Sequence, residues 1–599
     1  MIINDLIDYL EREKKFTEKD IKQIEVLPVE ELIEKGFVVD KMVFVKQMGD
    51  QALFSCDVNH SKFKTGDRVN LSGGRDANNA TVIENRPEEI SIKIDGDIHL
   101  SNKSFYRITY QQSQLLDPII KALKSLVPGA PGMFFYKTLN KSVKPKAKLP
   151  GGLDDKEILT KIKGLKINLI ESQFEAITKC LRKPSLLAIQ GPPGTGKTAV
   201  ISIVGEIFSQ TGQRVAILAP THQGVNNCLN IIRKQNPKRQ VVKIGNLLKS
   251  ESLNTDIETV EFYKFKSRYR KKRYHNNCII GMTYYSAILN LGLQTSGFAP
   301  NVIIIDEAGQ IPLSYGSVSG IFGAGSTIFL GDDAQMPPIF HARLADHKLS
   351  KSIFSHIREI HPQVIHPLDT TYRLNAEICN LVGNLFYPTE NGGTFLKPSS
   401  ASKDHRFPLE LPNTTPIIIK RVLNQSDSIV WVDNDVKESC SDINKKEAFV
   451  IANLLSACIK SGFPANEIAV VTPFRKQSLA IHDELRKAFP QIKKLPLIDT
   501  VERIQGASVE LVIISYCTNN MVYIDSVKDF IYSPNRLNVT ISRAKGKIIL
   551  FISRQMMLFG GQSIDKQREK FEYINKSTKA IYGLSELYDI LRRGYKTSL

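Results

Sequence analysis

The chain has 599 residues, 42% of them hydrophobic and 24% charged, which excludes a disordered chain and allows about three or four globular domains. Lys and Arg (80) outnumber Asp and Glu (61), so the net charge is +19 and the pI is near 9.3. This balance is typical of a protein with a polyanionic partner such as nucleic acid, although a solubilising surface gives the same numbers.

The eight cysteines are scattered, with no CxxC pair and no zinc-ligand spacing, which favours a reducing compartment and argues against a structural zinc. The N-terminus reaches acidic residues at once, unlike a signal peptide. Residues 311–331 carry no charge, but Pro312 and many Ser and Gly residues indicate buried interior, not a membrane span. We expect a cytoplasmic protein with no membrane association.

The first quarter of the chain changes pattern twice. Residues 1–36 are predicted to be a helical segment. Residues 37–110 break into short alternating segments separated by Gly, Asn and Asp, which predicts a small β-barrel. In residues 111–152, Asp117-Pro118 opens a helix, and a stretch rich in Pro and Lys after it predicts a linker.

Beyond the linker, eight apolar strand-like runs alternate with helical stretches, which is the pattern of parallel α/β sheets. Eight runs are enough for two sheets, with a break near 362–370. We therefore predict two tandem parallel-sheet P-loop domains of the α/β class after an N-terminal barrel. The expected ranges are 153–365, with a basic insertion at about 230–278, then 366–560, and a basic helical tail at 561–599.

The stretch GPPGTGKT fits the P-loop pattern and lies between a strand-like run and a helical stretch. Glycines let the backbone N–H groups point at phosphate oxygens, and the helix N-terminus adds positive potential. The sequence therefore predicts a nucleoside triphosphate site, in which Lys197 reaches the β- and γ-phosphates and Thr198 ligates Mg²⁺. The candidate contacts are Gly191, Gly194, Thr195, Gly196, Lys197 and Thr198.

In a second run, NVIIIDEAGQ (301–310), four β-branched residues are followed directly by two carboxylates. A strand parallel to the P-loop strand ends at the same sheet edge. We expect Asp306 to hold Mg²⁺ there, and Glu307 to orient and deprotonate the attacking water. A solvated acidic turn is the alternative for an isolated Asp-Glu pair; a complete P-loop makes the catalytic interpretation the stronger one.

Further motifs fall in order from residue 165 to residue 553, and they resemble those of superfamily 1 helicases. DEAGQ (306–310) resembles motif II, LGDDAQMPP (330–338) motif III, and VERIQGASVELVIIS (501–515) motif V. The remaining matches are the Q motif in 167–177, motif Ia in 218–227, motif Ic in 281–287, motif IV in 470–477, the QYRM-type motif in 369–378 and the RLNVALTRAK-type motif in 533–545.

Together with a preceding barrel, these motifs resemble the 5′-to-3′ branch of superfamily 1, specifically the up-frameshift-type helicases with two RecA-like lobes. The resemblance implies an ATP hydrolase. Gln310 and Gln335 would sense the γ-phosphate, and Gln173, Tyr372 and Gly506 would contact the nucleotide. Arg373 and Arg543 belong to the second lobe, so they would act as arginine fingers only when the lobes close. For Tyr372, a packed core role is nearly as well supported.

Several positions depart from the family pattern. Ser508 stands where motif V usually has glutamate, and Glu510 replaces an aspartate. Thr371 replaces the glutamine before Tyr-Arg, and His222 and Gly224 replace the more usual Asn and Ala of motif Ia. None of these positions belongs to the expected phosphate chemistry, so we expect an active ATPase with altered nucleotide or strand contacts.

Two sets of residues are candidates for nucleic-acid contacts. From 264 to 273 seven of ten residues are basic, with aromatic residues interleaved, a pattern that suits phosphates and stacked bases. A solvated charge run over a small aromatic core is an equal alternative. The basic residues are Lys264, Lys266, Arg268, Arg270, Lys271, Lys272 and Arg273; the resemblance adds Thr221, Thr283 and Thr472, for which a helix-capping role is the alternative.

The leading hypothesis is a monomeric ATP- and Mg²⁺-dependent helicase or translocase on single-stranded DNA or RNA. An ATP-gated clamp or protein-displacing switch would use the same catalytic residues but unwind little. A kinase-type P-loop enzyme is disfavoured because it does not need two arginines on a second sheet. The sequence does not distinguish DNA from RNA or identify protein partners, and it contains no recognisable nuclease residues.

Overall fold

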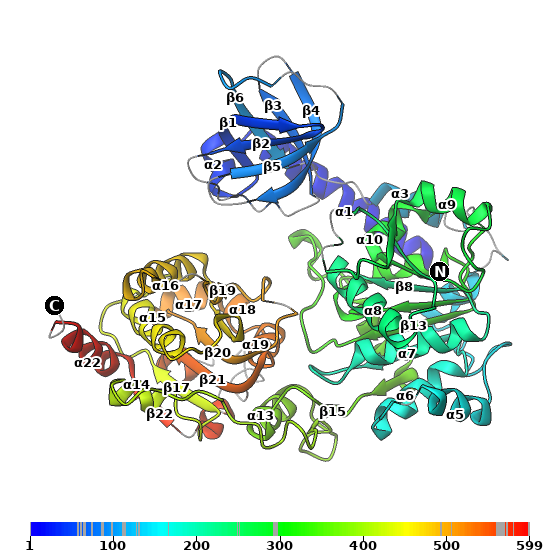
Figure 1. Ribbon diagram of the computed structural model, residues 1–599. Coiled ribbons are helices and arrows are strands. Elements are labelled where there is room, and N and C mark those ends of the chain that lie inside the picture. The colour runs from blue at the N-terminus through cyan, green and yellow to red at the C-terminus, as the bar shows by residue number, and fades with distance from the viewer. Residues whose placement is uncertain are drawn as a thin grey trace.

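The computed structural model has a small barrel and two larger lobes (Figure 1). The described residues are 2–56, 59, 61, 63, 67–73, 76–85, 89–96, 100–110, 116–126, 129, 132–165, 167–247, 250, 252–291, 297–491, 494–504, 506–558, 570, 573–578 and 580–596.

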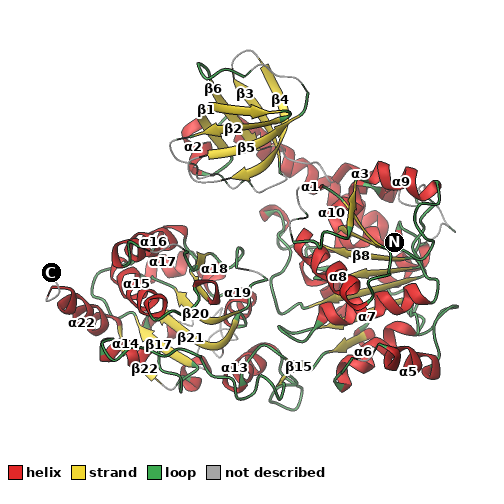
Figure 2. Ribbon diagram, viewed as in Figure 1, coloured by secondary structure: helices red, strands yellow, loops and turns green. Residues whose placement is uncertain are grey.

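Six antiparallel strands close the barrel in the order β1-β2-β5-β4-β3-β6 (Figure 2). Alternate residues point inward, as a small barrel requires, so Phe54, Val69 and Ile92 fill the interior. The strands are β1 (Val38–Met48), β2 (Gln51–Ser55), β3 (Arg68–Gly73), β4 (Asp76–Asn85), β5 (Glu89–Ile94) and β6 (Phe105–Tyr110).

An eight-stranded parallel sheet forms the first lobe, in the order β10-β9-β11-β8-β12-β13-β7-β14. Two of its strands, β9 and β10, come from the segment that the sequence analysis treated as a basic insertion; their short apolar runs pair directly with the sheet. The strands are β7 (Leu186–Gln190), β8 (Val215–Ala219), β9 (Val241–Ile244), β10 (Glu258–Val260), β11 (Ile279–Thr283), β12 (Val302–Ile305), β13 (Ser326–Gly331) and β14 (Ile365–Pro367).

Both faces of this sheet are covered, which explains why its strands are apolar throughout. In β12, Val302 and Ile304 face one helical layer, and Ile303 and Ile305 face the other. The first layer contains α5 (Asp155–Gly164), α6 (Glu171–Leu181), α7 (Lys197–Gln210) and α8 (His222–Gln235); the second includes α9 (Phe262–Arg270), α10 (Tyr284–Leu289), α11 (Leu313–Gly316) and α12 (Ile353–Ile360).

The N-terminal helices also belong to the second layer. Helices α1 (Ile2–Glu25), α3 (Leu116–Lys124) and α4 (Met133–Leu139) bury Leu6, Ile119 and Tyr136 in the same core. Helix α2 (Val29–Glu34) leads from α1 into the barrel. Part of the predicted linker is therefore a packed helix, in which Phe135 and Tyr136 are buried. The lysines and prolines around this helix made the segment resemble a linker in the sequence.

A six-stranded parallel sheet forms the second lobe, in the order β19-β18-β20-β21-β17-β22. The strands are β17 (Ile429–Asp433), β18 (Ile468–Val471), β19 (Leu497–Asp499), β20 (Val509–Ser515), β21 (Ala544–Ile552) and β22 (Ala580–Gly583). The predicted tail is thus not helical alone. Its run Ala580–Gly583 pairs with β17 because a short β-prone segment completes the open sheet edge.

The remaining helices surround this second sheet (Figure 1). They are α13 (Ala376–Phe386), α14 (Ile417–Val422), α15 (Lys445–Lys460), α16 (Arg475–Ala488), α17 (Met521–Ser526), α18 (Lys528–Ile531), α19 (Pro534–Ile541), α20 (Arg554–Leu558) and α22 (Leu584–Lys596). Two short strands, β15 (Thr370–Thr371) and β16 (Lys397–Pro398), pair where the chain leaves the first lobe. The predicted fold class, a barrel followed by two parallel-sheet lobes, is confirmed. Among the described residues, no helix is long and apolar enough to cross a membrane.

Candidate active site

The predicted phosphate loop joins β7 to the N-terminus of α7, as the motif requires. Gly194 and Gly196 have φ of 75° and 86°, a region in which glycine is favoured. A Cβ at Gly194 would lie 2.5 Å from the Cβ of Arg373, so only glycine allows the second lobe to approach the loop this closely. Lys197 Nζ donates to the carbonyl of Gly191 at 2.6 Å.

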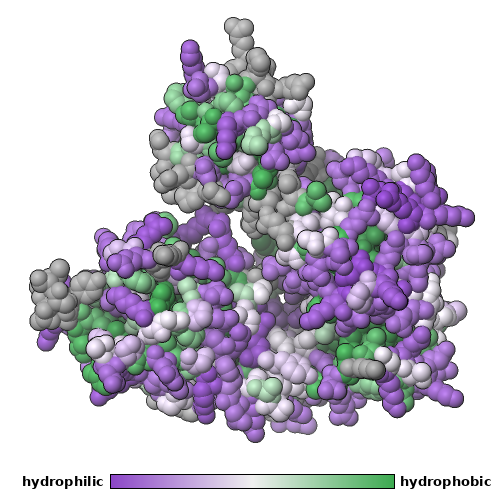
Figure 3. Space-filling model, in the orientation of Figure 1, coloured by the Kyte–Doolittle hydropathy of each residue, from purple (hydrophilic) through white to green (hydrophobic). Residues whose placement is uncertain are grey.

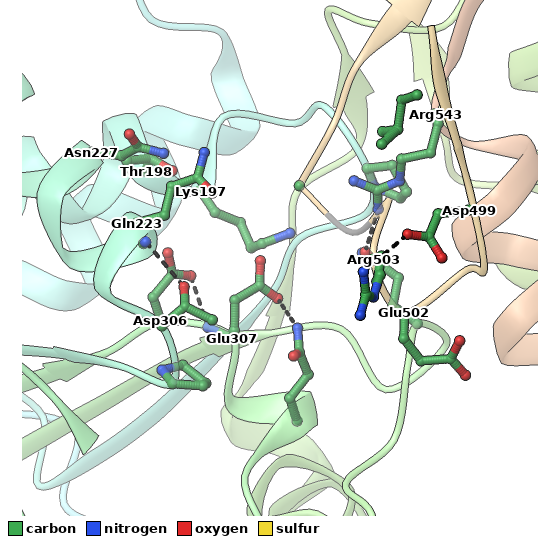
Figure 4. A pocket seen from close by; sticks show the side chains of 18 of the residues that line it. Lys197, Thr198, Gln223, Asn227, Asp306, Glu307, Asp499, Glu502, Arg503 and Arg543 are labelled. Atoms are coloured by element: carbon green, nitrogen blue, oxygen red, sulfur yellow. Dashed lines mark hydrogen bonds and ion pairs between the residues drawn. The ribbon is translucent and has the colours of Figure 1, made fainter. Parts of the chain in front are cut away.

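The two carboxylates follow β12 directly and face this loop (Figure 4). Asp306 is 5% exposed, and one of its oxygens accepts from the backbone N–H of Glu307 at 2.9 Å. Glu307 is in the left-handed region with φ 52°, and its side chain accepts from Gln310 Nε2 at 3.2 Å. A strained, non-glycine residue of this kind often marks a functional site.

Two arginines of the second lobe reach the same cleft. Arg543 is 4% exposed and donates to the carbonyls of Val539 and Ala507, and its Nη2 lies 3.4 Å from Gln335 Oε1. Arg373 Nη1 donates to the carbonyl of Ser542 at 3.2 Å. Neither guanidinium has a carboxylate partner within salt-bridge distance among the described residues, so both keep donors available for an anion.

The lobes are in direct contact around the phosphate loop. The N–H of Tyr372 donates to the carbonyl of Gly194 at 2.9 Å, and the Thr371 hydroxyl donates to the carbonyl of Pro193 at 2.8 Å. These bonds tie the chain leaving the first lobe to the loop itself. The arginines are therefore already at the boundary between the lobes.

Burial shifts the charged groups of the site in opposite directions. Desolvation, helped by Glu307 and opposed by Lys197, raises the pKa of Asp306 to about 7. Desolvation, helped by Arg543 and opposed by Glu307, lowers the pKa of Arg373 to about 9. Each shift is relieved by a ligand of opposite charge. A phosphate chain beside the arginines and a divalent cation beside Asp306 would supply both charges.

These groups line one cleft of about 1000 Å³ between the lobes. Of the predicted site residues, those that line it are Gly194, Thr195, Gly196, Lys197, Thr198, Thr221, Asp306, Glu307, Gln310, Gln335, Arg373, Gly506 and Arg543.

The cleft also has walls that the sequence analysis did not single out. Gln223 and Asn227 come from α8 (Figure 4), one turn apart, a helical spacing that could have revealed them inside motif Ia. Asp499, Glu502 and Arg503 come from the second lobe. The barrel contributes Asn59, Ser61, Phe63 and Asn85; these lie in or beside loops without periodicity, so no sequence signal pointed to them.

Three predicted nucleotide contacts lie outside the lining of this cleft. Gln173 is 5% exposed, and its Nε2 donates to the carbonyl of Thr195 at 3.0 Å, so it supports the phosphate loop from behind. Tyr372 is 47% exposed and is not packed in the core. Gly191 is the acceptor for Lys197. Gln505, next to Gly506, lies outside the described residues.

The three threonines have different surroundings. Thr221 is exposed in the cleft and caps α8, because its hydroxyl accepts from the N–H of Gly224 at 3.1 Å. Thr283 caps α10 in the same way and is 5% exposed. Thr472 is fully buried. Of the three, Thr221 alone lines the cleft as it stands.

The basic segment lies on the outside of the first lobe, where α9 is seen in Figure 1 and hydrophilic side chains gather in Figure 3. Its aromatic residues form a small core, which was the alternative to a nucleic-acid contact surface. In this core Tyr269 and Tyr274 stack on buried Phe265. Lys264 pairs with Glu261, and Arg268 with Glu258. None of the seven basic residues lines the cleft.

Comparison with known proteins found matches that cover most of the two lobes. Two family models, each described as an AAA domain, match residues 168–361 and 349–555. The DNA replication ATP-dependent helicase/nuclease dna2 of Schizosaccharomyces pombe is 27% identical over 75% of this chain and 32% of its own length. The Arabidopsis thaliana regulator of nonsense transcripts 1 homolog is 24% identical over 63% and 32%.

The chain is thus similar to ATP-dependent helicases, and its motifs resemble those of superfamily 1, up-frameshift-type. The chain matches about a third of the length of these curated relatives. The human DNA replication ATP-dependent helicase/nuclease DNA2 is 26% identical over 64% of this chain and 37% of its own length. A solved arterivirus nonstructural protein 10 (helicase) aligns with 92% of this chain and 83% of that chain, at 12% identity and a TM-score of 0.36.

Proposed function

We propose that this chain hydrolyses ATP in the cleft between its lobes and uses the closing and reopening of the lobes to move along single-stranded nucleic acid, in the 5′-to-3′ direction. One observation carries the proposal. Arg373 and Arg543, from the second lobe, line one cleft together with Lys197 and Glu307, from the first lobe. A γ-phosphate transferring to water develops charge that needs cations from both sides.

The residues of the cleft suit a nucleoside triphosphate with Mg²⁺. Thr198 offers a hydroxyl and Asp306 a buried carboxylate, the hard oxygen ligands that magnesium prefers. Bound there, the metal would neutralise phosphate charge. Glu307 would hold the attacking water and accept its proton, while Gln310 fixes the carboxylate and Gln335 and Arg543 face the γ-phosphate. Gln173 would hold the loop in shape, and exposed Tyr372 would stack on adenine.

The strand would run over the mouth of the cleft, below the barrel. Thr221, Gln223 and Asn227 offer hydroxyl and amide groups on the first lobe, and Arg503 offers a cation on the second. Thr283 and Thr472 would become contacts only after their surroundings rearrange, because both are buried. The seven cations of the basic segment would hold phosphates of the same polymer outside the cleft. The free cysteines suit a reducing, cytoplasmic setting.

The experiment is ATP hydrolysis with and without single-stranded DNA and single-stranded RNA, on wild type and Lys197→Ala. We expect stimulation by at least one polymer, and loss of turnover by about a hundredfold or more in the variant, because the lysine contacts the phosphates in the transition state. An unstimulated wild type, or an active Lys197→Ala variant, would contradict the proposal.

Duplexes with a 5′ or a 3′ single-stranded overhang then separate a motor from a clamp. A 5′-to-3′ motor displaces the strand from the 5′-overhang substrate at the rate of its ATP turnover. An ATP-gated clamp would hydrolyse ATP yet displace little strand from either substrate. Displacement from the 3′-overhang substrate alone would overturn the direction and keep the motor.

A further inference from the structure

A buried carboxylate behind the cleft lies where the two lobes meet. Asp332 follows β13 in the first lobe and is 2% exposed. Its Oδ2 accepts from Gln335 Nε2 at 2.6 Å and from the Tyr387 hydroxyl at 2.5 Å, and its Oδ1 accepts from the N–H of Ala334 at 3.2 Å. Neutral donors from both lobes therefore hold this carboxylate.

Tyr387 supplies the donor from the second lobe. It caps the C-terminus of α13, is 1% exposed, and accepts a hydrogen bond from Asn538 Nδ2 at 2.9 Å. Asn538 lies on α19, which leads to Arg543, and it also donates to the carbonyl of Ala334 at 2.9 Å. Tyr387 does not line the large cleft; it lines a separate pocket of about 340 Å³.

The carboxylate decides which way the Gln335 amide points. Because an ionised Asp332 only accepts hydrogen bonds, the NH₂ group of Gln335 must face it, and Oε1 is then turned to Arg543 Nη2 at 3.4 Å. Asn535 fixes the backbone of the same turn by donating to the carbonyls of Asp333 and Gln335. One hydrogen-bond chain thus runs from Tyr387 to the cleft.

We propose that Tyr387 is a positioning residue: when the lobes meet, its hydroxyl locks Asp332, and Asp332 in turn sets the Gln335 amide beside Arg543. Tyr387 touches neither nucleotide nor strand. Through this hydrogen-bond chain, contact between the lobes orients Gln335 and Arg543, the two groups proposed to face the γ-phosphate. ATP turnover therefore requires that α13 and α19 are packed against the first lobe. This inference rests on the proposed ATP hydrolysis.

Tyr387→Phe removes one oxygen atom and keeps the ring. Tyr532→Phe is the matched control, since Tyr532 is also buried in the second lobe and donates its hydroxyl to a backbone carbonyl, that of Met556 at 2.8 Å. At saturating strand, we expect Tyr387→Phe to lower kcat about tenfold, with the KM for ATP changed less than about twofold. Tyr532→Phe should leave both unchanged. Equal effects of the two variants would overturn the proposal.

A second comparison tests the route of the effect. If Tyr387 acts through Gln335, Tyr387→Phe should lower kcat less than about twofold further in a Gln335→Ala background. A full tenfold loss in that background would mean that Tyr387 acts independently of Gln335, and the proposal would fail.

Hydrogen exchange separates this inference from the proposed function, because it needs no turnover. In wild type, backbone amides of residues 331–337 and 534–543 should exchange slowly, and Tyr387→Phe should speed both segments together, while Tyr532→Phe should not. If wild type does not hydrolyse ATP, the proposed function is refuted. The exchange rates would then still test whether Tyr387 stabilises the contact between the lobes. Unchanged exchange in both segments would refute the inference whatever the turnover.

Discussion

The backbone of Glu307 has φ 52° and ψ 39°, a conformation that costs a residue with a Cβ about 1–2 kcal/mol. The turn is over-determined by its neighbours: Asp306 accepts from the N–H of Glu307, and Gln310 donates to its carboxylate. In this conformation the Glu307 side chain lines the cleft. That placement is what a water-activating base needs.

Replacing this carboxylate with an amide tests that role. We expect Glu307→Gln to keep ATP binding and to lower turnover by about a hundred- to ten-thousandfold, because an amide cannot accept the proton of the attacking water. ATP affinity by nucleotide titration and turnover should be measured on the same samples. Glu359→Gln, an exposed carboxylate paired with Lys351 on the same lobe, is the control. Undiminished turnover in Glu307→Gln would exclude its role as base.

A second buried carboxylate predicts a pH dependence of stability. Glu447, at the start of α15, is fully buried, and desolvation raises its pKa to about 8, although Ser515 and the N–H of Cys517 donate to it. A raised pKa in the folded state means that stability is highest below the unfolded pKa, falls progressively as the pH rises from there to about 8, and levels off above that pH.

Between about pH 7 and pH 9 this one group should cost wild type on the order of 1 kcal/mol of unfolding free energy. Glu447→Gln should lack that loss, so its stability should fall less steeply than that of wild type over the same range. Urea unfolding at several pH values measures the difference. Parallel slopes for the two proteins would show that Glu447 is ionised throughout.

At the scale of the elements, the sequence predicted what periodicity and P-loop spacing encode. The strands before Gly191 and Asp306 are continuous apolar runs, so their parallel sheet and shared edge followed directly. The strand β22 and the packed helix α4 were missed because each is short and lies next to a polar, lysine-rich stretch. Tertiary pairing decides such segments, and a single sequence does not display it.

The site residues were predictable where they belong to contiguous sequence motifs. Residues inside contiguous motifs, such as Lys197 and Glu307, fell into the cleft. Gln173 faces the back of the phosphate loop instead of the cleft, because orientation depends on how α6 packs. The contribution of the barrel around Asn59 and Asn85 could not be predicted from the sequence, because these side chains come together only through the register of strands and loops.

The position of α9 leads to a prediction about the basic segment. Lys271 and Arg273 are exposed just after this helix, outside the cleft. Replacing both with alanine should lower the slope of log affinity against log salt by about 1.4, or about 0.7 for each phosphate of the single strand that is no longer neutralised, and leave kcat at saturating strand unchanged. Binding titrations at several salt concentrations measure this slope.

Alanines at Arg421 and Lys437, exposed cations of the second lobe, provide a matched control for charge alone. Equal slopes for the two double variants would remove the basic segment from the nucleic-acid surface. A loss of kcat in the first variant would place the segment in the motor instead.

At the scale of the whole molecule, two similar sheets divide the chemistry between them. The first lobe carries the phosphate loop and the carboxylates, and the second lobe carries the arginines, so the proposed hydrolysis of ATP needs both lobes. Hydrogen bonds from Tyr372 and Thr371 to the phosphate loop join the lobes beside the nucleotide site. Opening and closing at this boundary is the ordinary domain motion that a translocating motor converts into steps. The barrel closes the third side of the same cleft.

The most direct measurement is strand-stimulated ATP turnover of Arg543→Ala and Arg373→Ala, with ATP affinity determined on the same preparations and Arg554→Ala, an exposed arginine of the second lobe, as the control. The account predicts near wild-type ATP binding and a fall in turnover of about a thousandfold or more for each of the two cleft arginines. Tight ATP binding with undiminished turnover in both would contradict it, because the first lobe would then carry out the hydrolysis without the second.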